Sequence, residues 1–370
     1  MTDLLGLLPF SSFAAAGVSL LATLLVLVTL PWHRHLSLDS TFGVQRNHCR
    51  PTPRVGGIGV VAGVLVGCLL AQPHRQSLLW PLLLAGLPAF VFGLTEDLTK
   101  RVSVRARLLA TLACGALGYA MTGYSITDVN VMGFDWLLGF SVFSVAFTAF
   151  AVGGVANAIN IIDGMNGLAS GSVIIILVSF AWLCHALGDL DLTLSCLILG
   201  GAVVGFMLVN WPLGKIFLGD GGAYFLGFSV AWLAVLLLAR HPEVSAWSPL
   251  LVCGLPILEV LFSILRRWRR RQKIGAPDCL HLHSLINRRL TRRLLPHASP
   301  LARNSATGAV MCCGEILPAY IALHWAGDTL FLVLAFSLCA LLYSAVYARL
   351  TQFRWCIGAL TLRDPVDVGA

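Results

Sequence analysis

The chain has 370 residues, of which 58% are hydrophobic and only 11% are charged, and its formal net charge is +8. Soluble domains carry about 25% charged residues, so this composition excludes a soluble globular fold. It predicts an all-α polytopic integral membrane protein, and the mean hydropathy of +0.84 supports the same class.

About eleven apolar stretches of membrane-spanning length follow one another along the chain. They are residues 4–30, 55–71, 77–94, 105–122, 137–156, 168–187, 192–209, 222–239, 249–265, 306–325 and 329–349. The residues before the first stretch include Asp3 and no basic residue, so we interpret this stretch as a retained span and not as a cleaved signal peptide. We predict a single transmembrane domain over residues 1–349, followed by a cytosolic tail over residues 350–370.

Basic residues predict the orientation of these spans. All Lys and Arg residues except Arg75 and Arg240 fall in or beside connectors on one side, which are residues 31–54, 95–107, 157–167, 210–221, 266–305 and the tail. Because basic residues stay on the cytosolic side, the N-terminus is predicted outside and the C-terminus in the cytosol. The net charge is therefore a topology signal and a contact with membrane lipid phosphate, and we predict no nucleic-acid partner. The 11 Cys include no CxxC pair, which gives a zinc or redox site little support.

The first polar cluster on the predicted cytosolic side joins two carboxylates to two basic residues. Glu96 and Asp97 end one span, and Arg105 and Arg107 open the next. Adjacent carboxylates could bind a hard cation or accept a proton. A solvated loop of mixed charge is the alternative.

The most informative cluster lies between two apolar stretches, at residues 157–167. Asn157, Asn160, Asp163 and Asn166 recur at three-residue spacing, which places neighbours on one face if the segment is helical. Asn side chains can bind a metal through oxygen and can recognise a planar amide such as uracil. A bilayer core penalises each such group, so their gathering indicates a site at a membrane face. A helix cap followed by a glycine-rich turn is the alternative.

A glycine-rich turn carries the next carboxylate, Asp220, a few residues after Lys215. Glycines let backbone amides approach phosphate, and the following helix N-terminus favours anions. Asp220 would suit Mg²⁺ shared with phosphate oxygens, or it could simply cap the helix.

Two basic segments complete the set. In residues 266–305 an Arg-rich run precedes His281 and His283, which could hold a pyrophosphate; a zinc site competes, but few further ligands are in view. Arg54 ends a segment stiffened by Pro51 and Pro53, which could meet a lipid phosphate.

Together these five blocks, in this order over about residues 46–289, resemble the polyprenyl-phosphate N-acetylhexosamine-1-phosphate transferase family (glycosyltransferase family 4). The resemblance is strongest to its bacterial undecaprenyl-phosphate GlcNAc-1-phosphate transferase branch. The family's paired acidic motif falls on Glu96 and Asp97, with Glu in place of the usual first Asp. Its His-x-His-His motif falls on His281 and His283, with Ser284 replacing the last His. Glu259 replaces a common family Asp, and its role is left open.

The resemblance implies an enzyme of the bacterial inner (plasma) membrane with a cytosolic active site. It would transfer GlcNAc 1-phosphate, or a related N-acetylhexosamine 1-phosphate, from the UDP-sugar to undecaprenyl phosphate. The products would be undecaprenyl-diphospho-sugar and UMP, which begins a cell-surface polysaccharide such as O-antigen, capsule, exopolysaccharide or teichoic acid. UDP-linked GalNAc, QuiNAc and FucNAc stay open as donors.

The resemblance also assigns roles to residues. Glu96, Asp97 and Asp163 are expected to be catalytic, and Asp220 and Asn160 to hold Mg²⁺, with Mn²⁺ as an alternative. Substrate binding is expected from Arg54, Arg105, Arg107, Asn157, Asn166, Lys215, His281 and His283. A secondary transporter is the rival hypothesis, but it would place polar residues at the middle of spans, where only Glu259 and Glu315 are charged.

Overall fold

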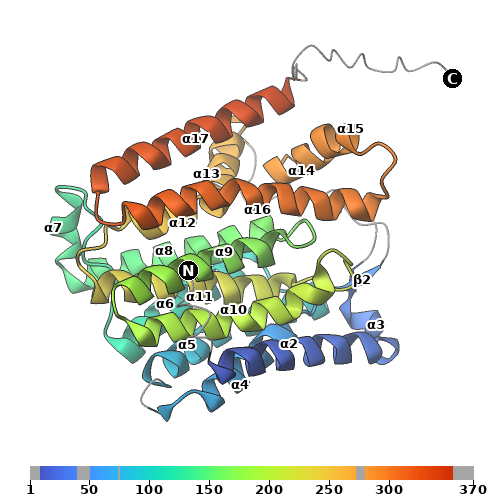
Figure 1. Ribbon diagram of the computed structural model, residues 1–370, viewed down its shortest axis with the longest axis horizontal. Helices are drawn as coiled ribbons and strands as arrows, with labels where there is room; N and C mark the ends of the chain where they lie inside the picture. The colour runs from blue at the N-terminus through green and yellow to red at the C-terminus, as the bar shows by residue number, and fades with distance from the viewer. Residues whose placement is uncertain (1–8, 40–50, 74–75, 272–279, 353–370) are drawn as a thin grey trace.

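The computed structural model describes residues 9–39, 51–73, 76–271 and 280–352, and these form a bundle of helices with one short two-stranded sheet (Figure 1). The all-α prediction is confirmed. The first helices are α2 (Phe10–Val28), α3 (Leu30–Ser37), α4 (Gly57–Leu70), α5 (Gln76–Thr99), α6 (Val104–Thr122), α7 (Phe134–Leu138), α8 (Ser141–Ile162), α9 (Leu168–Ala186) and α10 (Leu190–Asn210). The rest are α11 (Gly219–Arg240), α12 (Trp247–Val252), α13 (Gly254–Arg269), α14 (Leu282–Ile286), the π-helix η2 (Asn287–Thr291), α15 (Arg292–Leu294), α16 (Pro300–His324) and α17 (Thr329–Thr351). Strand β1 (Leu38–Asp39) pairs antiparallel with β2 (Thr52–Pro53).

Helices coincide with all the predicted spans, and the prediction of a polytopic membrane protein is confirmed. Within the described residues, 8 helices are long and apolar enough to cross a membrane: α2, α5, α8, α9, α10, α11, α16 and α17. Helix α4 is apolar but has only 14 residues. The predicted span over residues 249–265 is two helices, α12 and α13, divided at Cys253. The total number of spans and their orientation stay predictions.

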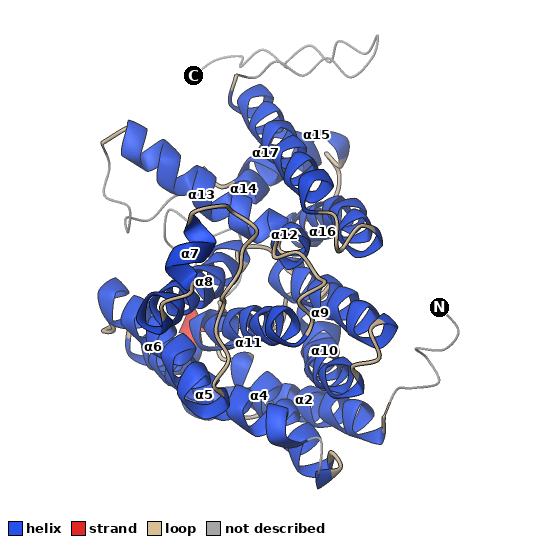
Figure 2. Cartoon of the chain, turned by 90° about the vertical axis from the view of Figure 1, so that its left-hand side faces the viewer, coloured by secondary structure: helices blue, strands red, loops and turns tan. Residues whose placement is uncertain are grey.

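Helix α11 forms the centre of the bundle, where Figure 2 shows it surrounded by α4, α5, α8, α9 and α10. Its sequence is apolar on all sides, which is typical of a helix buried in a protein interior. Phe225, Phe228 and Trp232 are completely buried. A β-carbon on Gly227 would lie 2.5 Å from Cα of Ala156 in α8, so the two backbones pack directly against each other. The position of α11 therefore fixes whatever its N-terminus carries.

Helix α2 is held between two rows of small residues. Gly59, Gly63 and Gly67 of α4 face it from one side, and Gly201 and Gly205 of α10 from the other. A β-carbon on Gly205 would lie 2.1 Å from a carbonyl oxygen of α2. Small residues allow such close packing of helices in membranes, where the hydrophobic effect between helices is weak.

A short segment before α4 lies alongside the residues that lead into α11. Phe217 N–H donates to the Pro53 carbonyl (2.9 Å), and Gly56 N–H donates to the Phe217 carbonyl (3.0 Å). Gly57 N–H continues this pairing to the Leu218 carbonyl (2.9 Å). The pairing places Arg54 beside the N-terminus of α11.

Candidate active site

Three helices meet backbone to backbone at the N-terminus of α11. A β-carbon on Gly93 of α5 would lie 2.5 Å from the nitrogen of Gly221, and one on Gly57 of α4 would lie 2.4 Å from the nitrogen of Gly222. Real β-carbons do not approach so closely, so glycine is required at both positions. This approach brings Asp97, one turn after Gly93, within a 3.0 Å hydrogen bond of Gly221 N–H.

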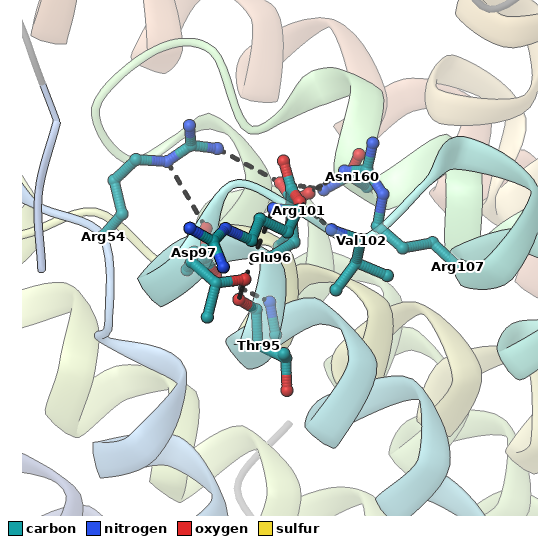
Figure 3. A network of polar contacts seen from close by, with 11 residues as sticks. Arg54, Thr95, Glu96, Asp97, Arg101, Val102, Arg107 and Asn160 are labelled. Carbon is teal, nitrogen blue, oxygen red and sulfur yellow. Dashed lines mark hydrogen bonds and ion pairs between the residues drawn. The ribbon is translucent and has the colours of Figure 1, made fainter. Parts of the chain in front are cut away.

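Asp220 is the centre of a network of polar and charged side chains, and Figure 3 labels Arg54, Asp97, Arg107 and Asn160 of this network. Its Oδ1 accepts from Arg54 Nη2 (3.1 Å) and from Asn160 Nδ2 (3.1 Å), and its Oδ2 accepts from Arg107 Nη1. Arg54 Nε also lies 3.6 Å from Asp97 Oδ1. Asp97 and Asp220 are 2% and 6% exposed, so these are charge-assisted contacts with little screening by water. The structure thus brings together five predicted site residues from five separate segments.

Asp163 directly follows α8 and interacts electrostatically with Arg54 and Asp220 of this network. The residue is half-buried, but protein atoms surround its carboxyl group, and this desolvation raises its pKa to about 7. Arg54 opposes the shift in pKa and Asp220 adds to it, which shows that the three groups share one electrostatic environment.

Tyr224 was not selected from the sequence but belongs to the same environment. It lies one turn after Asp220 on α11, is 4% exposed, and interacts electrostatically with Asp220 and Arg107. Its four-residue spacing from Asp220 is the signal that could have indicated it.

Three predicted residues, Glu96, Arg105 and Lys215, have no hydrogen bond to Asp220 or Asp97 among the described residues. Glu96 accepts a hydrogen bond from Val102 N–H (2.9 Å) and interacts electrostatically with Arg107. Arg105 and Lys215 are exposed, and neither side chain has a hydrogen bond or ion pair within the described part of the chain. The structure therefore separates Arg105 from Arg107, although the sequence places them two residues apart.

Asn157 lies on α8, nearly one turn before Asn160, and connects two helices. Its Nδ2 donates to Thr111 Oγ1 of α6 (3.2 Å) and to the Gly153 carbonyl (2.8 Å). These contacts hold α8 against α6, and the substrate-binding role of Asn157 stays a prediction.

Asn166 is enclosed by α16. Its backbone N–H donates to Asn304 Oδ1 (2.7 Å), and its Nδ2 donates to Ser305 Oγ (3.1 Å). The next residue, Gly167, has φ +76° and donates to Asn210 Oδ1 (2.8 Å). These bonds fix the glycine-rich turn after α8, whereas the predicted recognition of uracil by Asn166 is not tested by them.

The two histidines stack beside this turn. The rings of His281 and His283 are parallel within 3°, with centroids 5.4 Å apart, and both residues are buried. A β-carbon on Gly164 would lie 2.7 Å from His283 Nε2. The second ring therefore contacts the turn directly after Asp163.

Residues 40–50, residues 272–279 and the predicted tail from residue 353 lie outside the described residues.

The donor atoms at Asp220 fit a magnesium ion shared with phosphate. The described residues contain no group of three or more His, Cys, Asp or Glu arranged to hold a metal, and Mg²⁺ does not need one. It is usually held by one or two carboxylates, with substrate phosphates and waters completing the octahedron. Asp220 supplies a carboxylate, rotation of the Asn160 amide would supply an oxygen, and Asp97 Oδ1 is buried without a hydrogen bond in the described residues. These residues would hold the ion.

Comparison with known proteins shows which family the chain resembles. Residues 79–238, which contain Asp97, Asn160, Asp163 and Asp220, match the model of glycosyl transferase family 4. Over these residues the chain is similar to this family. A probable undecaprenyl-phosphate N-acetylglucosaminyl 1-phosphate transferase of Bacillus subtilis is 29% identical over 65% of the chain and 66% of its own length.

Two further relatives are undecaprenyl-phosphate alpha-N-acetylglucosaminyl 1-phosphate transferases. The protein of Yersinia pestis is 28% identical, over 66% of the chain and 68% of its own length. The protein of Escherichia coli is 26% identical, over 66% of the chain and 67% of its own length. The matched region thus spans about two thirds of these relatives.

Proposed function

We propose that this chain is a member of glycosyl transferase family 4, and that it transfers a sugar 1-phosphate from a UDP-N-acetylhexosamine to undecaprenyl phosphate and releases UMP. The site would face the cytosol from a bacterial inner membrane. The observation that supports this most is the network of Arg54, Asp97, Arg107, Asn160 and Asp220 at one end of the helix bundle. The names of the relatives support both the reaction and the lipid acceptor.

The two arginines suit the diphosphate of the donor. Arg54 and Arg107 now neutralise Asp220, and both are partly open to solvent, with 28% and 17% of their side chains exposed. Guanidinium groups bind phosphate oxygens through paired hydrogen bonds. A bound Mg²⁺ or Mn²⁺, held by Asp220 and Asn160, would neutralise charge on the diphosphate and on departing UMP.

The acceptor needs orientation more than deprotonation. A phosphate monoester has a second pKa of about 6, so its attacking oxygen is largely ionised at neutral pH. That oxygen would bond to the phosphorus that carries the sugar, and the bond from this phosphorus to the UMP oxygen would break. Asp97 and Asp163 would orient the acceptor phosphate, and positioning together with charge neutralisation would supply most of the rate.

An apolar cavity of about 370 Å³ suits the lipid chain of the acceptor. It is bounded by α8, α11, α12 and the loop before α7, and its lining includes Val152, Val155, Val235 and Trp247. Its lining residues nearest to the polar network in sequence are Val155, five residues before Asn160 on α8, and Ala231, eleven residues after Asp220 on α11. An isoprenoid chain in this cavity would have to extend along α8 and α11 for its phosphate to reach Asp220, because Ala231 and Asp220 are about 16 Å apart along the helix.

Secondary transport gains no support from these observations. The relatives are transferases, and the charged groups described above gather at one end of the bundle instead of at its middle. Transport of a substrate by the chain in vesicles, without transfer, would favour this second function.

The test is an exchange assay on membranes that contain the chain, undecaprenyl phosphate, Mg²⁺ and radiolabelled UDP-GlcNAc. Lipid-linked label that disappears with EDTA and is reversed by UMP is the expected result. Asp220→Ala and Asp97→Asn should abolish it, while Asp191→Asn, at the opposite end of the bundle, should not. If label is transferred only from another UDP-N-acetylhexosamine, the proposed reaction stands and the identity of the donor sugar is corrected. No label from any of them, with the protein inserted, would refute the proposal.

A further inference from the structure

Helix α13 buries its polar side and exposes its apolar side. Glu259, Ser263 and Arg266 recur at spacings of four and three residues and are 1%, 3% and 9% exposed. Leu261 and Trp268 of the same helix are 52% and 70% exposed. Figure 2 shows α13 projecting from the bundle. Such a pattern suits a helix that faces lipid outside and turns its polar groups to a protein partner.

The partner of this polar stripe is the segment that carries the histidines. Glu259 Oε1 accepts from His281 Nδ1 (3.0 Å) and from the backbone N–H of Leu282 (2.9 Å). Arg266 Nη1 donates to the Leu280 carbonyl (2.9 Å) and to the Tyr347 hydroxyl (2.9 Å). The helix therefore holds residues 280–282 at both ends, and Glu259 contacts the histidine end.

The contact from Glu259 determines how the His281 ring is presented. A carboxylate oxygen accepts a hydrogen bond, so Nδ1 of His281 carries the proton and the ring plane is fixed. The parallel ring of His283 stacks on it, and His283 contacts Gly164 beside Asp163. A continuous set of contacts thus leads from Glu259 through both imidazoles to the polar network.

We propose that Glu259 is a positioning residue that sets the orientation of His281, and through it His283, for phosphate binding in the transfer reaction. This inference rests on the proposed function. Carboxylates that orient metal-bound histidines typically change metal affinity or activity by about 10- to 100-fold when they are removed, and we expect an effect of the same order for an imidazole that binds phosphate. Glu259 itself lies behind the histidines and contacts no substrate.

The test compares Glu259→Ala with Glu259→Asp in the transfer assay. Glu259→Ala should lower kcat/KM by about 10- to 100-fold, and Glu259→Asp, which keeps a carboxylate, should recover most of this loss. The matched control is Glu315→Ala, because Glu315 is also buried in a helix but contacts Ser172 of α9 instead of a histidine. Equal losses in the Glu259→Ala and Glu315→Ala proteins, or no recovery by Asp, would overturn the inference.

A double-mutant cycle separates positioning from general support of the fold. If Glu259 acts through His281, the Glu259→Ala change should cost nothing further in a protein that already carries His281→Ala. If the double variant loses kcat/KM by the product of the two single-variant losses, the inference is overturned.

Hydrogen–deuterium exchange gives a readout that does not depend on activity. Loss of the acceptor for Leu282 N–H should speed exchange in a peptide covering residues 280–286 in Glu259→Ala but not in Glu315→Ala. Unchanged exchange would overturn the inference. If the wild-type chain transfers label and Glu259→Ala behaves like it, only the inference fails; if the wild-type chain transfers no sugar, the proposed function fails.

Discussion

A β-carbon at position 93 would collide with the backbone of α11. It would lie 2.5 Å from the nitrogen of Gly221 and 2.6 Å from the carbonyl carbon of Asp220. Backbone atoms cannot rotate away as a side chain can, so α5 and α11 must separate by about 0.9 Å to reach an ordinary 3.4 Å contact. Overpacking of this kind typically costs 1–3 kcal/mol, so we expect Gly93→Ala to insert and fold with reduced stability.

The same movement separates Asp97 from the residues of α11. A displacement of about 1 Å at reacting groups can lower a rate about 100-fold. We therefore expect Gly93→Ala to reduce transfer of radiolabelled sugar phosphate about 100-fold in membranes that contain equal amounts of protein. The loss of activity should exceed what the loss of folded protein explains.

Gly154→Ala is the matched control for this experiment. Gly154 is also a helical glycine of the bundle, but a β-carbon there would have no neighbour within 4 Å. Its activity should equal that of the wild type, and its thermal stability should equal or slightly exceed that of the wild type, because alanine is favoured over glycine within a helix by about 0.5–1 kcal/mol. If Gly93→Ala transfers sugar as fast as Gly154→Ala, the reasoning from the contact of α5 and α11 is refuted.

Three further predictions follow from charge. Because desolvation raises the pKa of Asp163 from 3.8 to about 7, its native carboxyl group keeps a proton that the unfolded chain has lost between those pH values, and native stability falls over this range. Asp163→Asn should therefore raise Tm more at pH 8 than at pH 5 while lowering transfer, and equal shifts in Tm would contradict this. Arg107→Ala should weaken binding of UMP in calorimetry, whereas Arg105→Ala should bind like the wild type. Burial opposes ionisation of Asp189, yet hydrogen bonds from Arg240 hold the pKa of this carboxyl group below its usual value. Asp189→Ala should therefore lower the free energy of unfolding by about 1–3 kcal/mol at pH 7. Thermal unfolding at several pH values should show this loss shrinking as the pH falls below about 4.

Much of the fold could be predicted because a membrane restricts the options of the chain. Apolar stretches of membrane-spanning length must be helical to satisfy their backbone polar groups, and helices coincide with the predicted spans. The division of residues 249–265 at Cys253 escaped this reasoning, since an apolar window registers composition and not the break between α12 and α13.

The central residues of the site could be selected because polar groups are rare beside apolar spans. Asp97, Asn160 and Asp220 stand out for that reason, the family resemblance adds roles for Arg54 and Arg107, and the structure gathers all five. Their chemical roles stay predictions.

Glu259 illustrates the limit of this approach. Its partner, His281, lies 22 residues further along the chain, and no spacing rule relates the two positions. The contact depends on how α13 leaves the bundle, which is a property of the tertiary structure.

The two arginines near residue 105 show how local conformation decides which of two similar residues reaches a site. As part of a connector over residues 95–107, an extended chain would point residues 105 and 107 to the same side, because side chains in extended backbone alternate. The helix instead begins at Val104, where the Ser103 hydroxyl accepts from Ala106 N–H (3.2 Å). Residues two apart on a helix do not face each other, so Arg107 reaches Asp220 while Arg105 stays exposed. The Ser103 cap thus determines which guanidinium group a phosphate at Asp220 would meet.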